Sequence, residues 1–511
     1  MKRGRNGSLI ALALVLCVAM PVGGICLTEQ SDDPEDESSS TFEDFEIVEK
    51  DWAIYLYLGG DNDEEDVIDF SINQCVRALR DAKMDGSELH MLALLDRNSV
   101  SGTWVYELTE NGREAAYNWP EQERNTSDPA TMVEFLDYAM LNYPAANTML
   151  VVKSGHAWCG VCPDYSEPDG SAMMTIDGLA SATADRDIDV IALDGDNMAS
   201  IEVAYELRHS TRYLVGTQQD MPIDGLPYYL TFKYLAETPS MLPVDLAIRM
   251  VTDFVIYYNN TDGKKNSLDH LLADSDMAVT ASVFDMGDDG EKMDSVVGAF
   301  SDLVNYMVNG ELPDALGGGL AYDSAVEDWA WISYNRSNIA AARDAALIGK
   351  MGDQAGYEWL PDIYTWLEAL NMFVNSDRYN ETFFPNVTDT ALLELVAAFH
   401  EEFNNSLVYL DQSQILNRSG LSTPHGLNMW FPPSWTQWDI LDYSREREYY
   451  YNGSKIELPA EVFCVDCPYH YSDVQLDLVE DTLWMTWFGI YYDSKWTIYG
   501  DLDAPRETPL W

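Results

Sequence analysis

The sequence predicts an α/β protein in which helices flank a largely parallel sheet. Over residues 51–240, short apolar runs rich in β-branched and aromatic residues alternate with segments of helical period. Glycine and aspartate end most of these runs, as expected where strands pass into loops. The chain has 511 residues, 47% of them hydrophobic, which is enough to bury a large core. Such alternation is typical of βαβ units, whose ligands gather at the carboxyl ends of the strands.

The predicted strands and helices of this first region follow in order along the chain. The opening strand is WAIYLYLGG, which two glycines stop, and a helix with acidic residues in its first turn follows at 63–79. A second helix covers 127–143, with Asp128 as N-cap and Pro129 at the first helical position. Its predicted buried face carries Met132, Phe135, Leu136 and Ala139. Further strands are predicted at 88–96, 103–108, 148–152, 189–194 and 212–216.

Beyond residue 240 the pattern changes, which predicts a C-terminal helical and β-rich region. Residues 241–420 are predicted to be mainly helical, and residues 421–511, rich in Trp and Tyr, to be β-rich. The helical periods lie at 243–258, 294–309 and 390–406, and the C-terminal strands are predicted at 426–431 and 483–492.

The N-terminus predicts export. Basic residues precede an apolar run at 9–20 that is short for a membrane span, so residues 1–26 are predicted to be a signal peptide and 27–50 an acidic linker. Lipidation at Cys26 is the less favoured alternative. No other apolar run has membrane-spanning length, so the mature chain is expected to be secreted or at the cell surface. Eight Asn-x-Ser/Thr sequons beyond the predicted signal peptide favour a glycoprotein: Asn125, Asn259, Asn335, Asn380, Asn386, Asn404, Asn417 and Asn452.

The net charge of −58 excludes nucleic acid as a favourable partner, because phosphates would be repelled. Basic peptides and metal cations are the ligands that such a field attracts, although a solvated acidic surface is the simpler explanation. No cofactor is required, no metal site is assigned, and calcium binding is left open. The acidic run at 59–66 lacks the glycine and distant glutamate of an EF-hand and is expected to cap the helix that follows.

Two C-x-x-C pairs carry most of the remaining cysteines, namely Cys159, Cys162, Cys464 and Cys467. In an exported chain these residues are disulfide candidates. Coordination of zinc by the four thiolates is the alternative.

Several segments of the first region resemble, in order and spacing, the clostripain family of cysteine peptidases. They include WAIYLYLGGDND, the segment ending SGHAWCGV, DVIALDGDNMASIEVAYELR and LVGTQQDMPIDGLPY, and PHGLNMWFPP continues the resemblance weakly. The resemblance implies a caspase-like α/β sandwich, a His/Cys dyad on loops after neighbouring strands, and polypeptide substrates cut after a basic residue. In such a dyad the histidine lowers the pKa of the thiol and later protonates the leaving amine.

This chain departs from the family at the nucleophile. Asp196 stands where the resemblance places the cysteine, whereas Asp194 keeps its match and is predicted, with Asp220 at the rim, to bind a basic substrate side chain. His156 is the candidate histidine, and an ungapped alignment from Trp158 would place Ser154 there instead. For Asp196 the simplest explanation is a helix cap, by Asp196 or its neighbour Asn197, for a helix beginning near Met198.

Three functional hypotheses follow. The favoured one is an exported clostripain-like homologue that is catalytically impaired and retains a cleft for basic peptides. The second is an active endopeptidase cutting after Arg or Lys, with Cys159 as a relocated nucleophile. The third is a non-enzymatic surface or adhesive glycoprotein.

Overall fold

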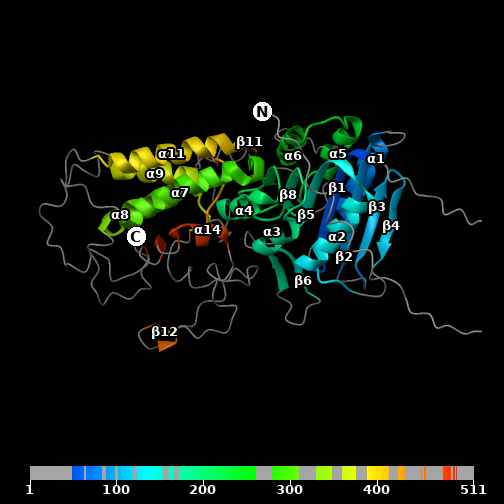
Figure 1. Ribbon diagram of the computed structural model, residues 1–511, viewed down its shortest axis with the longest axis horizontal. Coiled ribbons are helices and arrows are strands. Elements are labelled where there is room, and N and C mark those ends of the chain that lie inside the picture. Colours follow the sequence, from blue (N-terminus) through cyan, green and yellow to red (C-terminus); the bar gives the residue numbers. More distant parts are fainter. Residues whose placement is uncertain are drawn as a thin grey trace, which may run out of the picture. The chain divides into compact units, whose positions relative to one another are not determined.

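The structure is a computed structural model with one large mixed sheet between two layers of helices (Figure 1). It describes residues 49–62, 65–82, 88–97, 102–118, 123–153, 160–165, 172–259, 279–309, 330–347, 360–375, 388–413, 424–431, 450–451, 454–455, 476–484, 487–488 and 491. The predicted signal peptide and nearly all of the predicted linker therefore lie outside the described residues. Among the described residues, no helix combines the length and apolar character needed to cross a bilayer.

The sheet has nine strands in the order β11-β10-β9-β8-β5-β1-β2-β3-β4. Its middle, from β9 to β2, is parallel, and antiparallel strands extend both edges. All six strands predicted in the first region are present, so the predicted fold class is confirmed. The strand bounds are β1 Lys50–Gly60, β2 Leu89–Arg97, β3 Trp104–Thr109, β4 Gly112–Asn118, β5 Ala145–Lys153, β8 Val190–Asp194, β9 Tyr213–Gly216, β10 Thr280–Asp285 and β11 Leu407–Gln412.

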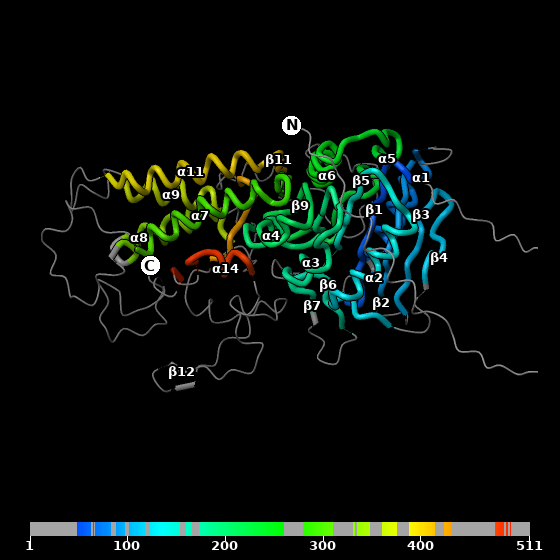
Figure 2. Tube along the Cα trace, in the orientation of Figure 1, coloured from blue at the N-terminus to red at the C-terminus, as the bar shows by residue number. Residues whose placement is uncertain are grey.

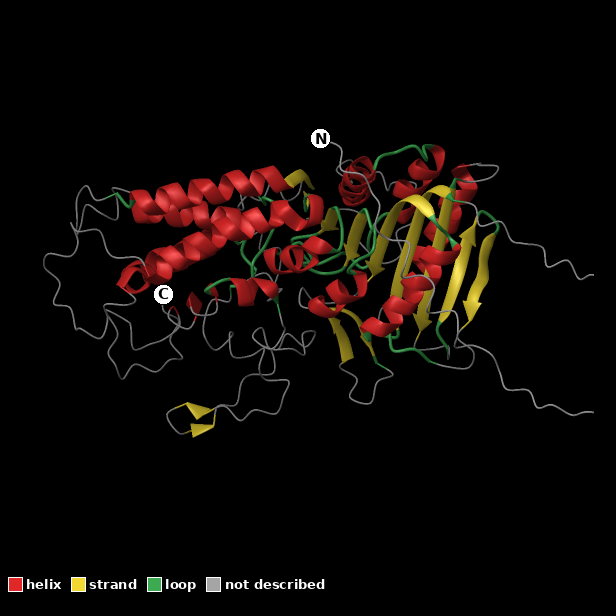
Figure 3. Cartoon of the chain, in the orientation of Figure 1, coloured by secondary structure: helices red, strands yellow, loops and turns green. Residues whose placement is uncertain are grey.

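The two faces of the sheet bury separate hydrophobic cores. In β1, Tyr55 and Tyr57 point to one core and Ile54 and Leu56 to the other, because successive side chains of a strand alternate. One face is covered by α1 (Glu65–Ala82), α5 (Tyr228–Glu237) and α6 (Pro243–Tyr258). The other is covered by α2 (Pro129–Asn142), α3 (Ile176–Thr183) and α4 (Ile201–Glu206). Four longer helices pack against one another and extend this second core beside the sheet (Figure 3): α7 (Glu291–Asn309), α8 (Ala330–Ala345), α9 (Ile363–Asn375) and α11 (Thr390–Ser406).

The helix α2 confirms its predicted start and face. Asp128 is the N-cap, and its Oδ1 accepts a hydrogen bond of 2.9 Å from the backbone N–H of Ala130. Pro129 opens the helix, where its missing N–H costs nothing. The four apolar residues predicted to face the core are fully buried.

The segment beyond residue 240 continues the same sheet. Strand β10 pairs with β9 and strand β11 pairs with β10, both antiparallel. The predicted division at residue 240 therefore cuts through one continuous sheet. The helices predicted at 243–258, 294–309 and 390–406 are present as α6, α7 and α11, and α7 packs beside α11 (Figure 2).

The two C-terminal strand predictions are wrong. Residues 426–431 contain only an isolated bridge residue, Asn428, which pairs with Ser200 and Asp362. The described residues at 484, 487, 488 and 491 are helical and fully buried. Residues 487, 488 and 491 follow residue 484 by three, four and seven positions, which is the spacing of one helix face. The strand prediction was wrong because it relied on the aromatic composition of the segment. Described strand in this region is limited to β12 (Tyr450–Tyr451) and β13 (Ser454–Lys455), and a short helix α14 covers Asp477–Asp481.

Candidate functional site

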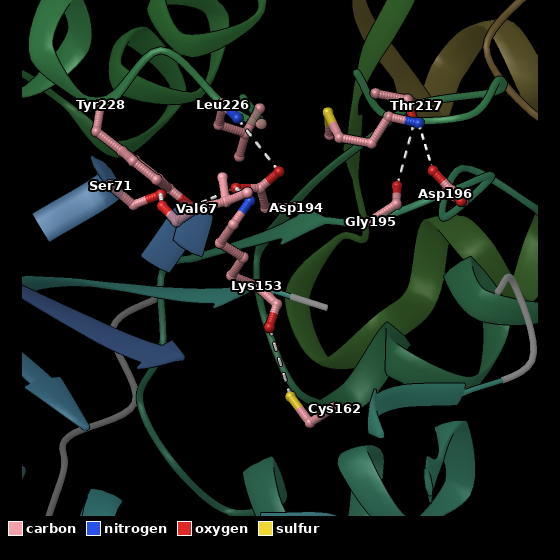
Figure 4. A network of polar contacts seen from close by, with 12 residues as sticks. Val67, Ser71, Lys153, Cys162, Asp194, Gly195, Asp196, Thr217, Leu226 and Tyr228 are labelled. Carbon is pink, nitrogen blue, oxygen red and sulfur yellow. Dashed lines mark hydrogen bonds and ion pairs between the residues drawn. The ribbon is translucent and has the colours of Figure 1, made fainter. Parts of the chain in front are cut away.

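A buried ion pair joins the carboxyl ends of two central strands. Lys153 ends β5, Asp194 ends β8, and the two residues are direct partners in the parallel register. Lys153 Nζ lies 3.1 Å from Asp194 Oδ2, and the residues are only 2% and 1% exposed (Figure 4). Lys153 is not among the residues predicted from the sequence, although a lysine directly after the apolar run 148–152 was a signal. Charges this deeply buried are tolerated only when they are paired.

Two further donors complete the environment of Asp194. The Tyr228 hydroxyl donates to Oδ2, and the backbone N–H of Leu226 donates to Oδ1 at 3.2 Å. Gly225 allows this close approach: its φ is +71°, and a Cβ there would lie 2.5 Å from both Asp194 Oδ2 and Lys153 Nζ. The role of Asp194 in binding a substrate's basic side chain stays a prediction. It would require the substrate to displace Lys153 from the carboxylate.

The turn after β8 places Asp196 at a partly exposed position. Its Oδ1 accepts a hydrogen bond of 2.5 Å from the backbone N–H of Met221, so the carboxylate ties this turn to the loop after β9 (Figure 4). The adjacent Asn197 has a φ of +56°, and its Nδ2 donates to Asp220 Oδ1 at 2.8 Å. Asp196 and Asp220, both predicted site residues, thus belong to two loops joined by hydrogen bonds.

The helix-cap explanation for Asp196 is wrong. Helix α4 begins at Ile201, and its N-cap is Ser200, whose side chain accepts from the backbone N–H of Val203 at 3.2 Å. Residues 198–199 separate Asp196 and Asn197 from this N-cap. They pair with the loop after β9, since the backbone N–H of Ala199 donates to the carbonyl oxygen of Thr217. The Asp196 carboxylate is therefore not explained by helix capping.

His156 and Cys159 lie outside the described residues, as do Ser154, Trp158, Cys464 and Cys467. Lys153, the last described residue before residues 154–159, pairs in register with Asp194 at the end of β8. The pairing of His156 with the Asp196 position and the disulfide assignments therefore stay predictions.

Cys162 is described and does not resemble an activated nucleophile. It is fully buried, and its thiol donates a weak hydrogen bond to the carbonyl oxygen of Lys153 at 3.7 Å (Figure 4). Burial raises the pKa of the Cys162 thiol well above its usual range, because a thiolate would lose its hydration. Since the thiolate is the reactive form, this residue cannot act as the displaced nucleophile in the structure described.

A buried polar cluster connects the loop after β9 to the C-terminal part of the chain. Gln218 Nε2 donates to Asp362 Oδ2 at 2.9 Å and to Asn428 Oδ1 at 3.1 Å. Asp362 also accepts from the backbone N–H of His425 at 2.7 Å. Burial lowers the pKa of His425, but the Asp362 carboxylate outweighs this effect, so the net shift is upward. These four polar residues come from segments far apart in the sequence. His425 and Asn428 lie in the segment PHGLNMWFPP, which carries the weak end of the family resemblance, but the sequence did not indicate that they meet Gln218 and Asp362.

The fold and the site define the class of protein. The sheet has a parallel centre and is flanked by helices, which is the caspase-like arrangement. The predicted site loops follow its neighbouring strands β5 and β8. The chain belongs to the clostripain family: the model of that family, Peptidase_C11, matches residues 56–351. A comparison with curated protein sequences gives no significant match.

Solved structures of this family share the fold. An inactive zymogen of a C11 protease from Parabacteroides distasonis is 16% identical, with a TM-score of 0.51 over 75% of this chain and 93% of that one. The secreted C11 cysteine protease iotapain from Bacteroides thetaiotaomicron is 15% identical, with a TM-score of 0.50 over 75% and 94% of the two chains. At this identity the similarity establishes the fold alone.

Proposed function

We propose that the chain is an exported clostripain-family protein that binds basic polypeptides and has lost their hydrolysis. The observation that carries the proposal is Asp196, which occupies the turn after β8 where the family resemblance places the nucleophilic cysteine. Its carboxylate is held by the Met221 N–H. A carboxylate is a weak nucleophile toward an amide, and the tetrahedral intermediate formed by its attack would expel the carboxylate more readily than the amine.

Aspartic-type hydrolysis by the neighbouring acids Asp196 and Asp194 is not a substitute mechanism. That chemistry needs two carboxylates close enough to share one proton. Asp194 is the nearest acid in sequence, but it is paired with Lys153 and hydrogen-bonded to Tyr228. Both oxygens of Asp194 are thus engaged by other groups, since Leu226 N–H donates to Oδ1 and Lys153 and Tyr228 contact Oδ2. Asp196 therefore lacks Asp194 as the partner that such a mechanism requires.

The remaining alternative is a relocated cysteine nucleophile. Cys162 is excluded by its burial and raised pKa. Cys159, on the segment after β5, is the residue on which an active endopeptidase would depend. Activity through Cys159 is therefore the hypothesis that the peptide-library experiment must exclude.

Binding of a basic polypeptide is supported by charge. The chain carries a net charge of −58, which raises the local concentration of cationic ligands. Asp196 and Asp220 are both partly exposed on the loops where the family carries its site. A guanidinium forms charge-assisted hydrogen bonds with such carboxylates. Export is supported by the N-terminal pattern and by the sequons.

The test is incubation of the full mature chain with an Arg/Lys peptide library and a thiol-directed arginyl inhibitor. We expect binding of basic peptides, no cleavage and no inhibitor adduct, with affinity lowered by Asp196→Ala. The matched control is Asp302→Ala, which removes an exposed acid from α7. Cleavage that Cys159→Ala abolishes would overturn the proposal in favour of the active peptidase. Equal binding by both alanine variants would show that any attraction is only that of the overall charge.

A further inference from the structure

A pocket lies at the edge of the sheet opposite to the one that carries Lys153 and Asp194. Its walls are the segments that lead into β8 and β9 and the turn after β10, which meet because β9 runs parallel to β8 and antiparallel to β10. The pocket has a volume of about 360 Å³, which is within the range of sites for small ligands. It contains none of Asp194, Asp196 and Asp220, so it is a separate site from the one proposed to bind peptides.

Charged side chains of both signs line this pocket. They are the basic residues Arg186, Arg208, His209 and Arg212 and the acids Asp187, Asp189, Asp288 and Asp289. Asp288 accepts a hydrogen bond from Arg212. Asp289 has His209 beside it, with Oδ1 at 3.3 Å from Nδ1. Within the described part of the chain no lysine, arginine or histidine pairs with Asp187 or Asp189, so these two carboxylates carry the unbalanced negative charge of the pocket.

Asp189 is the less exposed of these two acids. Its Oδ2 accepts a hydrogen bond of 2.8 Å from the backbone N–H of Thr148. Burial raises the pKa of Asp189, and the charge of Asp187 adds to this effect, although the Thr148 N–H opposes it. A cationic group placed between the two carboxylates would stabilise their ionised forms, because an opposite charge within a few ångströms favours ionisation.

The same pocket offers hydrogen-bond donors that the described chain leaves unused. Ser210 is only 2% exposed, and its hydroxyl makes no hydrogen bond to a described residue. Arg208 donates through Nε and Nη1 to three acceptors, whereas its Nη2 donates to none among the residues described. Buried polar groups are normally hydrogen-bonded, so these donors call for an acceptor from outside the chain. A carboxylate suits them, because it accepts hydrogen bonds from a hydroxyl and from a guanidinium.

We propose that this pocket binds a small zwitterion with one ammonium and one carboxylate group, as in a free amino acid. Asp187 and Asp189 receive the ammonium group. Ser210 and Arg208 donate to the carboxylate. A simple anion is disfavoured by the net charge of −58, whereas a zwitterion is neutral overall. A simple cation would leave the Ser210 hydroxyl unsatisfied and would meet three guanidinium groups in the same pocket.

The experiment is calorimetric titration of the full mature chain with glycine, L-serine, L-glutamine and L-leucine, which are neutral zwitterions of different size. About 0.15 M salt screens diffuse charge effects. We expect at least one of the four to bind at a saturable site. The decarboxylated and the deaminated counterparts of that amino acid are titrated in parallel. Each should bind at least about tenfold more weakly, because each leaves charged or hydrogen-bonding groups of the pocket unsatisfied.

Two variants locate the binding site. Asp187→Asn alters an exposed acid and should weaken amino-acid binding by about tenfold, and Ser210→Ala should weaken it as well. The matched control is Asp185→Asn, which removes an exposed acid two residues earlier that does not line the pocket, and it should leave the affinity unchanged.

Three outcomes would overturn the proposal. The first is no saturable binding of any of the four amino acids. The second is equal affinity for the decarboxylated or the deaminated counterpart, which would make the pocket a site for simple cations or simple anions. The third is binding that survives both Asp187→Asn and Ser210→Ala. Because the peptide library tests Asp196 and these variants test the pocket, peptide binding and amino-acid binding can each fail alone.

Discussion

Two groups of titratable side chains lie at the same edge of one sheet. The first is the buried pair Lys153 and Asp194, at the ends of β5 and β8. The second, around the ends of β1 and β2, consists of the buried acids Asp61 and Asp96 and the exposed Glu123. In the first group a lysine from the chain itself neutralises the carboxylate, and Tyr228 and Leu226 donate to its oxygens. In the second group Asp96 keeps an oxygen without a described partner.

The comparison separates a buried carboxylate that the protein itself neutralises from one whose state depends on protons or ions from the solvent. A carboxylate saturated by internal donors gains nothing from an added cation, and it resists exchange with a ligand because its partner would be left buried and unpaired. A carboxylate left unsatisfied stays responsive to protons and to metal ions. The predictions below test this contrast, from the largest expected effect to the smallest.

Lys153→Met should cause the largest loss of stability. It leaves Asp194 buried without its cation, and breaking one partner of a buried ion pair costs about 3–5 kcal/mol. Urea unfolding measures the change in the free energy of unfolding. The double variant Lys153→Met/Asp194→Asn should recover part of the loss, because it removes the stranded charge. A loss below about 1 kcal/mol in the single variant would mean that the pair is not as buried as described.

Asp96→Asn should stabilise the protein at alkaline pH when EDTA removes divalent cations. The pKa of Asp96 in the folded state is about 8, above its unfolded value near 4, so the folded chain binds more protons between these limits. Stability therefore falls as pH rises from about 4 to 8, by up to about 1.4 kcal/mol per unit. The Asp96→Asn substitution should remove this fall and raise the free energy of unfolding by about 1–3 kcal/mol at pH 8. Melting curves from pH 5 to 8.5 that are parallel for the two proteins would refute the prediction.

Gly225→Ala should destabilise by about 2 kcal/mol, from crowding and from the positive φ. The new methyl group would press on both partners of the Lys153–Asp194 pair. The measurement is again urea unfolding, with Gly298→Ala as the control, because that helical glycine has open space around its Cβ position. Alanine there should be neutral or slightly stabilising. Equal changes in the free energy of unfolding for Gly225→Ala and Gly298→Ala would show that Lys153 and Asp194 can shift to accommodate the methyl group.

Lys233→Met should have the smallest effect, below about 0.5 kcal/mol. Lys233 forms an i,i+4 pair of 3.2 Å with Glu237 on the surface of α5, and such exposed pairs contribute little. This variant removes the same charge as Lys153→Met in a solvated setting. A loss comparable to that of Lys153→Met would mean that burial is not what makes the first pair important.

Much of the fold could be predicted because its signals are local. The apolar runs of β1, β2, β5, β8 and β9 and the cap of α2 each depend on residues adjacent in sequence. The C-terminal aromatic segment was mispredicted because composition was weighed above the helical spacing of Trp484, Trp487, Phe488 and Tyr491.

The candidate site could be predicted only in part. The position of Asp196 after β8 and its nearness to Asp220 followed from strand order and from the family resemblance. The partners of these residues did not, because hydrogen bonds such as Asp196 to the Met221 N–H depend on how two loops meet. The start of α4 at Ser200, and hence the failure of the cap explanation, was likewise decided by loop geometry.

The sequence by itself determined the α/β class, the family resemblance and the presence of an aspartate at position 196, where that resemblance places a cysteine, because each depends on residue identity and local periodicity. Only the tertiary structure decided which buried charges are satisfied. Lys153 reaches Asp194 because two parallel strands stand in register. Asp61, Asp96 and Glu123 converge because β1 and β2 end at one edge of the sheet, beside the segment that carries Glu123. Electrostatic energy depends on distance and burial, and neither quantity can be read from positions along the chain.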